Sequence, residues 1–188
     1  MPRFLIALTF CLLNLLPSAY AREGAVVRIE PIVQQGRLLL DADIDFTLDG
    51  DLHDAAQKGV PLYFTADLKI EHPRWWWFDE TIIAIERTWS IQFNALTRQW
   101  QVGIGDVSQP AATLDEALNL VRHVRGWPIG PVSLFESGVR YEGQLRLRLD
   151  TSRLARPFQI DAINSKTWSL STPWKKFTFS LSAETPRD

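Results

Sequence analysis

The chain has 188 residues, of which 22 are acidic and 20 are basic, and its formal net charge is −2 at pH 7. This weakly acidic balance argues against a nucleic acid or an anionic membrane surface as partner, because phosphate binding requires a basic face. The single cysteine is Cys11. The rest of the chain therefore has neither a disulfide nor a cysteine metal site, and a packed core must stabilise it.

Residues 1–21 are typical of a secretory signal peptide. Arg3 supplies the positive charge, residues 4–16 form a short apolar run, and Ala19-Tyr20-Ala21 has the small residues of a cleavage site. Cleavage is expected after Ala21. The apolar run is shorter than the ~20 residues that a helix needs to span a bilayer, which disfavours the alternative of an uncleaved anchor. The sequence thus predicts a periplasmic protein with residues 22–188 as one domain.

The mature chain is predicted to open with two strands and a short helix. Val26 to Val33 and Leu38 to Phe46 form the pair of strands, and Gln34-Gln35-Gly36 connects them. A helix of one or two turns follows, capped by Asp51 and stopped by Gly59.

Apolar and polar residues alternate most clearly in residues 62–71 and 83–93. This period of two indicates strands with one buried face and one solvated face. Arg87 is the exception, since it falls on the apolar face of the second strand. Residues 94–98 are short enough for a hairpin turn into the next strand, which covers residues 100–104.

A second helix is predicted over Leu114 to Val124, with Thr113 as its N-cap and an apolar stripe along one side. Gly126 and Pro128 end it, and Arg125 to Gly138 is expected to be a loop between two sets of strands. Residues 141–149 and 177–181 alternate again and form the last strands.

Strands grouped in hairpins, rather than alternating with helices, favour antiparallel pairing over a parallel sheet with crossover helices. The sequence therefore predicts a mainly β fold. The expected architecture is an antiparallel β-sandwich, either immunoglobulin-like or an open-barrel variant, with two short helices.

Four clusters in this order resemble the domain of unknown function 4390 family. They are Arg74-Trp75-Trp76-Trp77 with Asp79, Leu96-Thr97-Arg98-Gln99-Trp100, Leu149 to Leu154 running to Pro157-Phe158-Gln159, and Ser171-Thr172-Pro173-Trp174. The resemblance covers nearly all of the mature chain and implies an exported protein of Gram-negative bacteria. The family has no assigned activity. Its members are often encoded beside a membrane sensor histidine kinase, which implies a signalling partner.

The run Trp75-Trp76-Trp77-Phe78 is the most distinctive candidate site. Side chains alternate along an extended strand, so Trp75 and Trp77 would share one face next to Arg74. They would form a platform for sugar rings, a peptide or the membrane interface, and Trp127 would add a further stacking residue. The alternative is that a helix or the second sheet covers this face, because tryptophan is buried on average.

Two further features allow a structural or a functional interpretation. Arg98 either pairs with an acidic neighbour across its hairpin or binds a partner from the turn. Asp41, Asp43 and Asp45 alternate along one strand face, which suggests calcium because hard cations prefer oxygen ligands. A solvated strand face explains the three carboxylates equally well, and the row does not match an EF-hand loop.

The sequence shows no zinc-type histidine spacing, no nucleophile elbow and no glycine-rich phosphate loop. We therefore expect no metal, no cofactor and no enzyme activity, although a carboxylate pair assembled by folding, as in a glycosidase, stays open. The favoured function is a periplasmic interaction module that binds an envelope protein or a glycan and assists a membrane sensor. The alternative is a domain that binds glycans or small apolar ligands through surface tryptophans.

Overall fold

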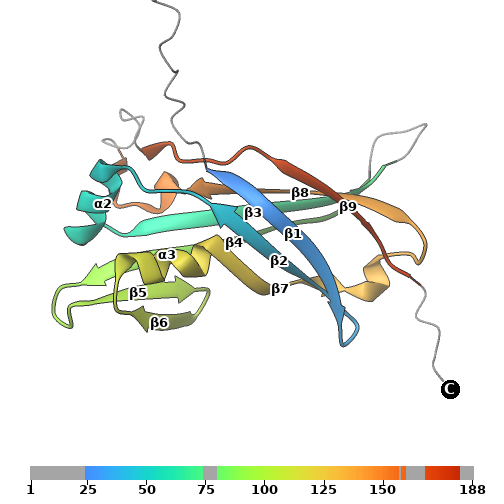
Figure 1. Ribbon diagram of the computed structural model, residues 1–188, viewed down its shortest axis with the longest axis horizontal. Coiled ribbons are helices and arrows are strands. Elements are labelled where there is room, and N and C mark those ends of the chain that lie inside the picture. The colour runs from blue at the N-terminus through green and yellow to red at the C-terminus, as the bar shows by residue number, and fades with distance from the viewer. Residues whose placement is uncertain (1–23, 74–79, 157, 160–167, 183–188) are drawn as a thin grey trace, which may run out of the picture.

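The computed structural model describes residues 24–73, 80–156, 158–159 and 168–182. These residues form two antiparallel sheets that do not close into a barrel (Figure 1). The smaller sheet has the order β1-β2-β7, with bounds Ala25–Gln34, Arg37–Asp45 and His123–Pro131. The larger sheet has the order β6-β5-β4-β3-β8-β9, with bounds Val107–Ala111, Gln99–Ile104, Glu80–Asn94, Leu62–His72, Arg140–Leu149 and Lys175–Ser180. The predicted fold class is confirmed.

The inner faces of the two sheets share one apolar core. Leu38 and Leu40 of β2 and Phe64, Ala66 and Leu68 of β3 are all at most 2% exposed. Burial of a side chain the size of leucine or phenylalanine stabilises the fold by roughly 1.5–3 kcal/mol. The alternation that predicted the strands therefore also identifies the side chains that hold the sheets together.

The turns at the ends of the strands also follow the sequence. Gln35 and Gly36 both have positive φ, at 51° and 70°, as a tight two-residue hairpin requires. In the turn between β4 and β5, the Asn94 side-chain oxygen accepts hydrogen bonds from the backbone amides of Leu96 and Thr97, at 3.0 and 3.3 Å. The side chain of Asn94 thus caps this turn.

The first helix, α2, covers Gly50–Gln57. The predicted cap was wrong by two residues: the carboxylate of Asp49, not that of Asp51, accepts a backbone hydrogen bond, from Asp51 N at 3.2 Å. Both aspartates suit an N-cap, and the chain starts the helix at the earlier one. Gly59 follows the helix with φ of 91°, as expected for a stop signal.

The second helix, α3, covers Leu114–Arg122 and ends two residues before the predicted Val124. Thr113 caps it as expected, because its hydroxyl accepts from Glu116 N at 3.1 Å. The apolar stripe is buried and contacts β2, β5 and β7, so α3 covers inner-face area that the narrower sheet leaves open (Figure 1). Among the described residues, no helix has the length and apolarity needed to cross a bilayer.

Arg125 to Gly138 was predicted to be a loop, and this was wrong. Its first half belongs to β7, which pairs antiparallel with β2 and is followed by the short 3-10 helix η1, Val132–Leu134. Glycine and proline are tolerated in β7 because it is an edge strand with two register shifts against β2. The edge strand β6, with the sequence VSQPA, was also not predicted.

Strand β4 is much longer than β5, its neighbour on the side away from β3. It has 15 residues, but β5 pairs only with Trp89 to Asn94. On the side away from β3, residues 81–88 have no strand partner in the part of the chain that the structure describes. Half of β4 is therefore a free sheet edge, and it begins where β5 ends.

Candidate functional site

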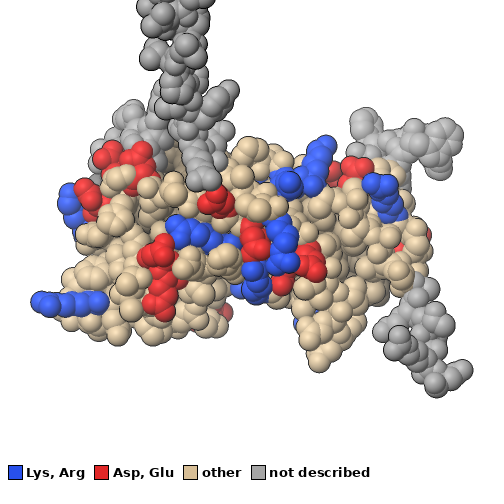
Figure 2. All heavy atoms as spheres, in the orientation of Figure 1, with Lys and Arg blue, Asp and Glu red and all other residues tan. Residues whose placement is uncertain are grey.

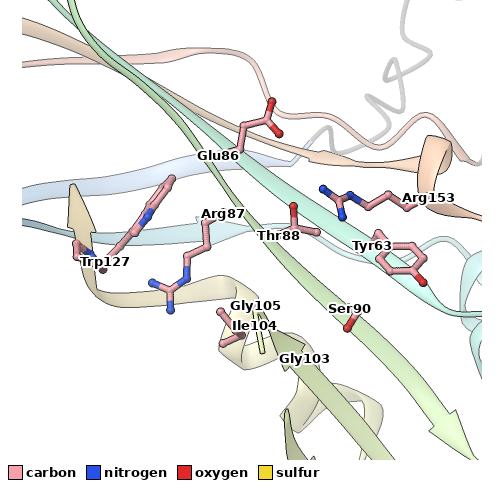
Figure 3. A pocket seen from close by; sticks show the side chains of 11 residues that line it. Tyr63, Glu86, Arg87, Thr88, Ser90, Gly103, Ile104, Gly105, Trp127 and Arg153 are labelled. Carbon is pink, nitrogen blue, oxygen red and sulfur yellow. The ribbon is translucent and has the colours of Figure 1, made fainter. Parts of the chain in front are cut away.

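A cleft of about 550 Å³ lies at the point where β5 ends beside β4 (Figure 3). Its volume falls within the ~300–1,000 Å³ that is usual for ligand sites. Three strands supply most of the wall: Glu86, Arg87 and Thr88 come from β4, Gly103 to Gly105 from the end of β5, and Trp127 with Pro128 from β7. The site therefore joins both sheets and depends on the position of β7.

Arg87 is the central cation of this cleft. It lies opposite Ala66 of β3 and so faces inward, toward the space between β7 and the end of β5 (Figure 3). Its Nη1 atom is buried and has no hydrogen-bond partner among the described residues. The guanidinium carbon stands 5.3 Å from the centroid of the Trp89 ring, an attractive cation–π contact.

Burial lowers the pKa of Arg87 from its ordinary value, yet a guanidinium stays protonated at neutral pH. A buried donor without an acceptor costs roughly 1–3 kcal/mol. An anion that entered the cleft would supply the missing acceptor in a partly desolvated place, where charge-assisted hydrogen bonds are strong. The local chemistry thus favours binding of a carboxylate or a similar oxyanion.

The neighbouring charges on the outer face of the larger sheet are paired with one another. Asp67 of β3 is 8% exposed and accepts from Arg146 Nε at 2.7 Å and Arg148 Nε at 3.1 Å. Arg148 also lies 3.5 Å from the carboxylate of Glu86, and Arg146 stacks on Trp174 at 4.5 Å. Arg146, Arg148 and Arg153 therefore have acidic partners, whereas no described residue forms an ion pair with Arg87.

Asp150 ends β8 and begins the 3-10 helix η2, Thr151–Arg153. Burial acts to raise the pKa of Asp150, but the Ser152 hydroxyl at 2.6 Å and the charge of Arg148 outweigh it, and the pKa is lowered. Arg153 pairs with the same carboxylate at 3.3 Å and reaches the cleft rim. The Asp150 carboxylate thus caps the turn that follows β8 by accepting from Ser152 N at 3.2 Å.

The smaller sheet carries a second group of charges on its outer face, visible as the mixed patch over β1 and β2 (Figure 2). Asp43 accepts from His123 Nδ1 at 3.0 Å, Arg125 at 2.5 Å and Arg28 at 2.8 Å. These bonds hold its pKa well below the ordinary aspartate value. Asp41 accepts from Gly126 N at 2.7 Å.

Two of the carboxylates that suggested calcium, those of Asp41 and Asp43, are thus engaged by protein donors. Two arginines lie against the row, which would repel a cation from it. Within the described ranges, no group of three or more histidine, cysteine, aspartate or glutamate side chains is placed to hold a metal ion. The row serves to join β1, β2 and β7.

Trp127 and Arg98 are the predicted site residues that the structure describes. Trp127 is 5% exposed and lines the cleft beside Arg87, with its ring turned inward and not displayed on an open surface. Arg98 has φ of 54° and lies in the turn before β5, whereas the cleft lies at the other end of that strand. The structure therefore brings Trp127 to the site and leaves Arg98 away from it.

The expected ion pair of Arg98 across its hairpin is absent among the described residues. The remaining predicted positions, Arg74, Trp75 and Trp77, lie outside the described residues, as does the predicted cleavage site at Ala21. Their roles stay predictions.

Sequence reasoning did not select Arg87 as a site residue, although one signal was present. Arg87 is the charged member of the inward series Ile83, Ile85, Arg87, Trp89, Ile91. A charge on the buried face of a strand is costly unless something pairs with it. That pattern marks the position, but only the structure shows that no described residue supplies the partner.

A second, apolar cleft of about 580 Å³ opens between the β1–β2 hairpin and β9. Val33, Leu38, Phe135, Phe179 and Leu181 line it. Phe135 and Phe179 also belong to a group of stacked and edge-on rings with Tyr141. This cleft has the walls of a site for a small apolar ligand.

Comparison with known proteins gives one family and no individual relative. No curated protein and no solved structure matches the chain. A family profile described as a domain of unknown function (DUF4390) matches residues 21–178. That match spans most of the sequence and includes the four clusters that carry the resemblance. The chain therefore belongs to the DUF4390 family of domains of unknown function.

Proposed function

We propose that this protein is an exported, non-catalytic interaction module that binds a carboxylate-bearing partner in the Arg87 cleft. The observation that carries the proposal is the buried Nη1 of Arg87, which has no acceptor among the described residues and faces a cleft of about 550 Å³. The signal-like residues 1–21 support export to the periplasm. The partner proposed is an envelope protein, such as the membrane sensor that the family resemblance implies.

Binding explains the cleft better than catalysis does. A glycosidase requires two carboxyl groups that flank the bond to be cleaved. Of the described residues that line the cleft, Glu86 alone is acidic, and its carboxylate pairs with Arg148. Arginine next to tryptophan is a combination typical of recognition sites, because both side chains give large contact areas.

The test uses the mature protein and a blocked aspartate, acetylated at its amino end and amidated at its carboxyl end. The blocked asparagine of the same size is the neutral control ligand. Trp89 and Trp127 adjoin Arg87, so tryptophan fluorescence reports binding. Arg87→Met removes the cation, and Arg37→Met makes the same change at an exposed site in another part of the fold.

We expect a saturable signal with the blocked aspartate, with a dissociation constant of about 1 mM because a single ion pair is a weak ligand. Arg37→Met should keep the signal and Arg87→Met should lose it. Equal responses to aspartate and asparagine, or an unchanged signal in Arg87→Met, would refute the proposal. Recovery of a chain that begins at Arg22 from the periplasm tests the export part.

The apolar cleft supports a second candidate function, the binding of a small apolar ligand. Its walls are mainly aliphatic and aromatic, and Val33 at its rim is 51% exposed. An apolar ligand would gain roughly 25 cal/mol for each Å² of apolar surface that it removes from water. This function does not involve Arg87.

The probe for this second function is N-phenylnaphthylamine, an uncharged dye that fluoresces in apolar surroundings. Val33→Glu places a charge at the rim of the cleft and should weaken dye binding about tenfold, since a desolvated carboxylate is costly. Val27→Glu is the matched control, because Val27 is also exposed and lies on β1 away from the cleft. Equal dye binding by the two variants would exclude this site.

A further inference from the structure

We infer that the partner is an extended polypeptide segment that adds a strand to the free edge of β4, residues 81–88, and places a carboxylate against Arg87. This inference rests on the proposed function and names the class of partner and the mode of its binding. Strand addition to an exposed sheet edge is a common mode of peptide recognition, in which backbone hydrogen bonds provide affinity and side-chain pockets provide specificity.

The edge of β4 beyond the end of β5 is long. On the side away from β3, residues 81–88 offer roughly 26 Å of backbone, at ~3.3 Å per residue, that no described strand pairs with. Natural edges are usually blocked by lysine, proline, a bulge, an inward-pointing charge or a covering segment. This stretch reads TIIAIERT and contains neither lysine nor proline. Its register shift lies at the far end, between Thr81 and Ile83, and its inward-pointing charge is Arg87, the group that would pair with the partner.

The inner face of this half of β4 is covered, so a partner that reaches Arg87 would approach along the backbone edge. Ile83 is 7% exposed, and a Cβ built on Gly130 of β7 would lie 3.2 Å from the Ile83 side chain. β7 therefore packs across the inner face of β4. An added strand would continue the line of β5 beyond Ile104 and occupy the position that β5 leaves open.

The position of Arg87 fixes where the carboxylate must be. Arg87 is two residues before Trp89, the first residue of β4 that pairs with β5. The acidic group would thus lie at the end of the added strand that adjoins β5. Ile85 lies two residues before Arg87 on the same face of β4. The side chain of the added strand that adjoins Ile85 is therefore expected to be apolar.

The source of the carboxylate determines the direction of the added strand. A strand parallel to β4 would bring its C-terminal end to Arg87, so a free terminal carboxylate fits only this direction. A strand antiparallel to β4 would bring its N-terminal end there, and the carboxylate would then belong to an aspartate or glutamate side chain. In both cases the ligand chemistry is a carboxylate on an extended backbone.

The experiment uses the mature protein and peptides of about seven residues made of alternating valine and threonine. One series has blocked ends and a single aspartate at each position in turn. A second peptide has no aspartate but a free C-terminal carboxylate, and a fully blocked peptide without aspartate is the control. Affinity is measured by tryptophan fluorescence for the wild type, Arg87→Met and Arg37→Met. Backbone hydrogen exchange of residues 81–88 is measured with and without peptide.

We expect a peptide with a terminal carboxylate or a terminal aspartate to bind at least tenfold more tightly than the uncharged control, in the wild type and in Arg37→Met. Arg87→Met should remove this difference. Alternate amides within residues 81–88 should exchange more slowly when the peptide is bound, because a β-ladder engages every second amide of the edge. Blocked aspartate alone should leave the exchange of residues 81–88 unchanged.

The outcomes separate the two proposals. Binding that depends on Arg87 without protection of residues 81–88 would overturn strand addition and leave the anion site intact. Protection along residues 81–88 that is the same for charged and uncharged peptides would overturn the role given to Arg87 here. If Arg87→Met binds every peptide with the same affinity as the wild type, and the blocked aspartate also fails to bind, the proposed function is refuted as well.

Discussion

Gly143 of β8 has no side chain, and this leaves space for an aromatic ring of the edge strand β9. It lies directly opposite Phe177 in the β8–β9 pair, and the Phe177 ring covers it. A Cβ at this position would collide with that ring. Phe177 also stacks on Phe179, with ring centroids 6.1 Å apart. Glycine weakens most strands, but here its missing side chain is the site where an aromatic ring packs.

We therefore expect Gly143→Ala to lower the free energy of unfolding by about 1–3 kcal/mol, since overpacking displaces the ring. Urea unfolding followed by circular dichroism measures this change. Gly50→Ala is the control, because open space surrounds that glycine in the first turn of α2 and alanine favours a helix. If Gly143→Ala were as stable as Gly50→Ala, the packing role of the glycine would be disproved.

At the scale of elements, seven of the nine described strands could be predicted, most of them because their side chains alternate between core and solvent. β7 does not alternate in this way, since Gly126, Pro128, Gly130 and Pro131 interrupt its pattern. As an edge strand it needs hydrogen bonds on one side only, so tertiary pairing with β2 overrides local preference. β6 is short and mostly exposed, so it leaves no periodic signal.

The candidate site depends on the elements that the sequence did not reveal. The cleft exists because β7 places Trp127 against β4 and because β5 is shorter than β4. Neither relation can be read from alternation, which reports which face of a strand is buried but not which strands are neighbours. Arg87 stood out as an irregular residue in its strand, but only the assembled sheets show that none of the described residues gives its Nη1 an acceptor.

At the scale of the whole molecule, the two sheets use charge in different ways. The outer face of the smaller sheet holds a network in which Asp43 joins its own strand, β2, to Arg28 of β1 and to Arg125 and His123 of β7. The outer face of the larger sheet holds the network around Asp67. Both networks are paired internally, whereas the buried Nη1 of the inward-facing Arg87 has no hydrogen-bond partner among the described residues.

The Asp43 network predicts how the stability of the protein depends on pH. The hydrogen bonds from His123, Arg125 and Arg28 depress the pKa of Asp43 in the folded state. A carboxylate with a depressed pKa contributes stability above its unfolded pKa of ~3.9, and this contribution is lost as the pH falls toward the folded-state value. We expect the free energy of unfolding of the wild type to decrease as the pH is lowered below about 4. Asp43→Asn should be about 1 kcal/mol less stable than the wild type at pH 7, and the difference should be smaller at pH 3.

Urea titrations at several pH values measure the free energy of unfolding of the wild type and of Asp43→Asn. Asp106→Asn, a change in an exposed turn, controls for the loss of one charge. Parallel pH profiles for the Asp43 and Asp106 variants would show that the network does not couple protonation to folding.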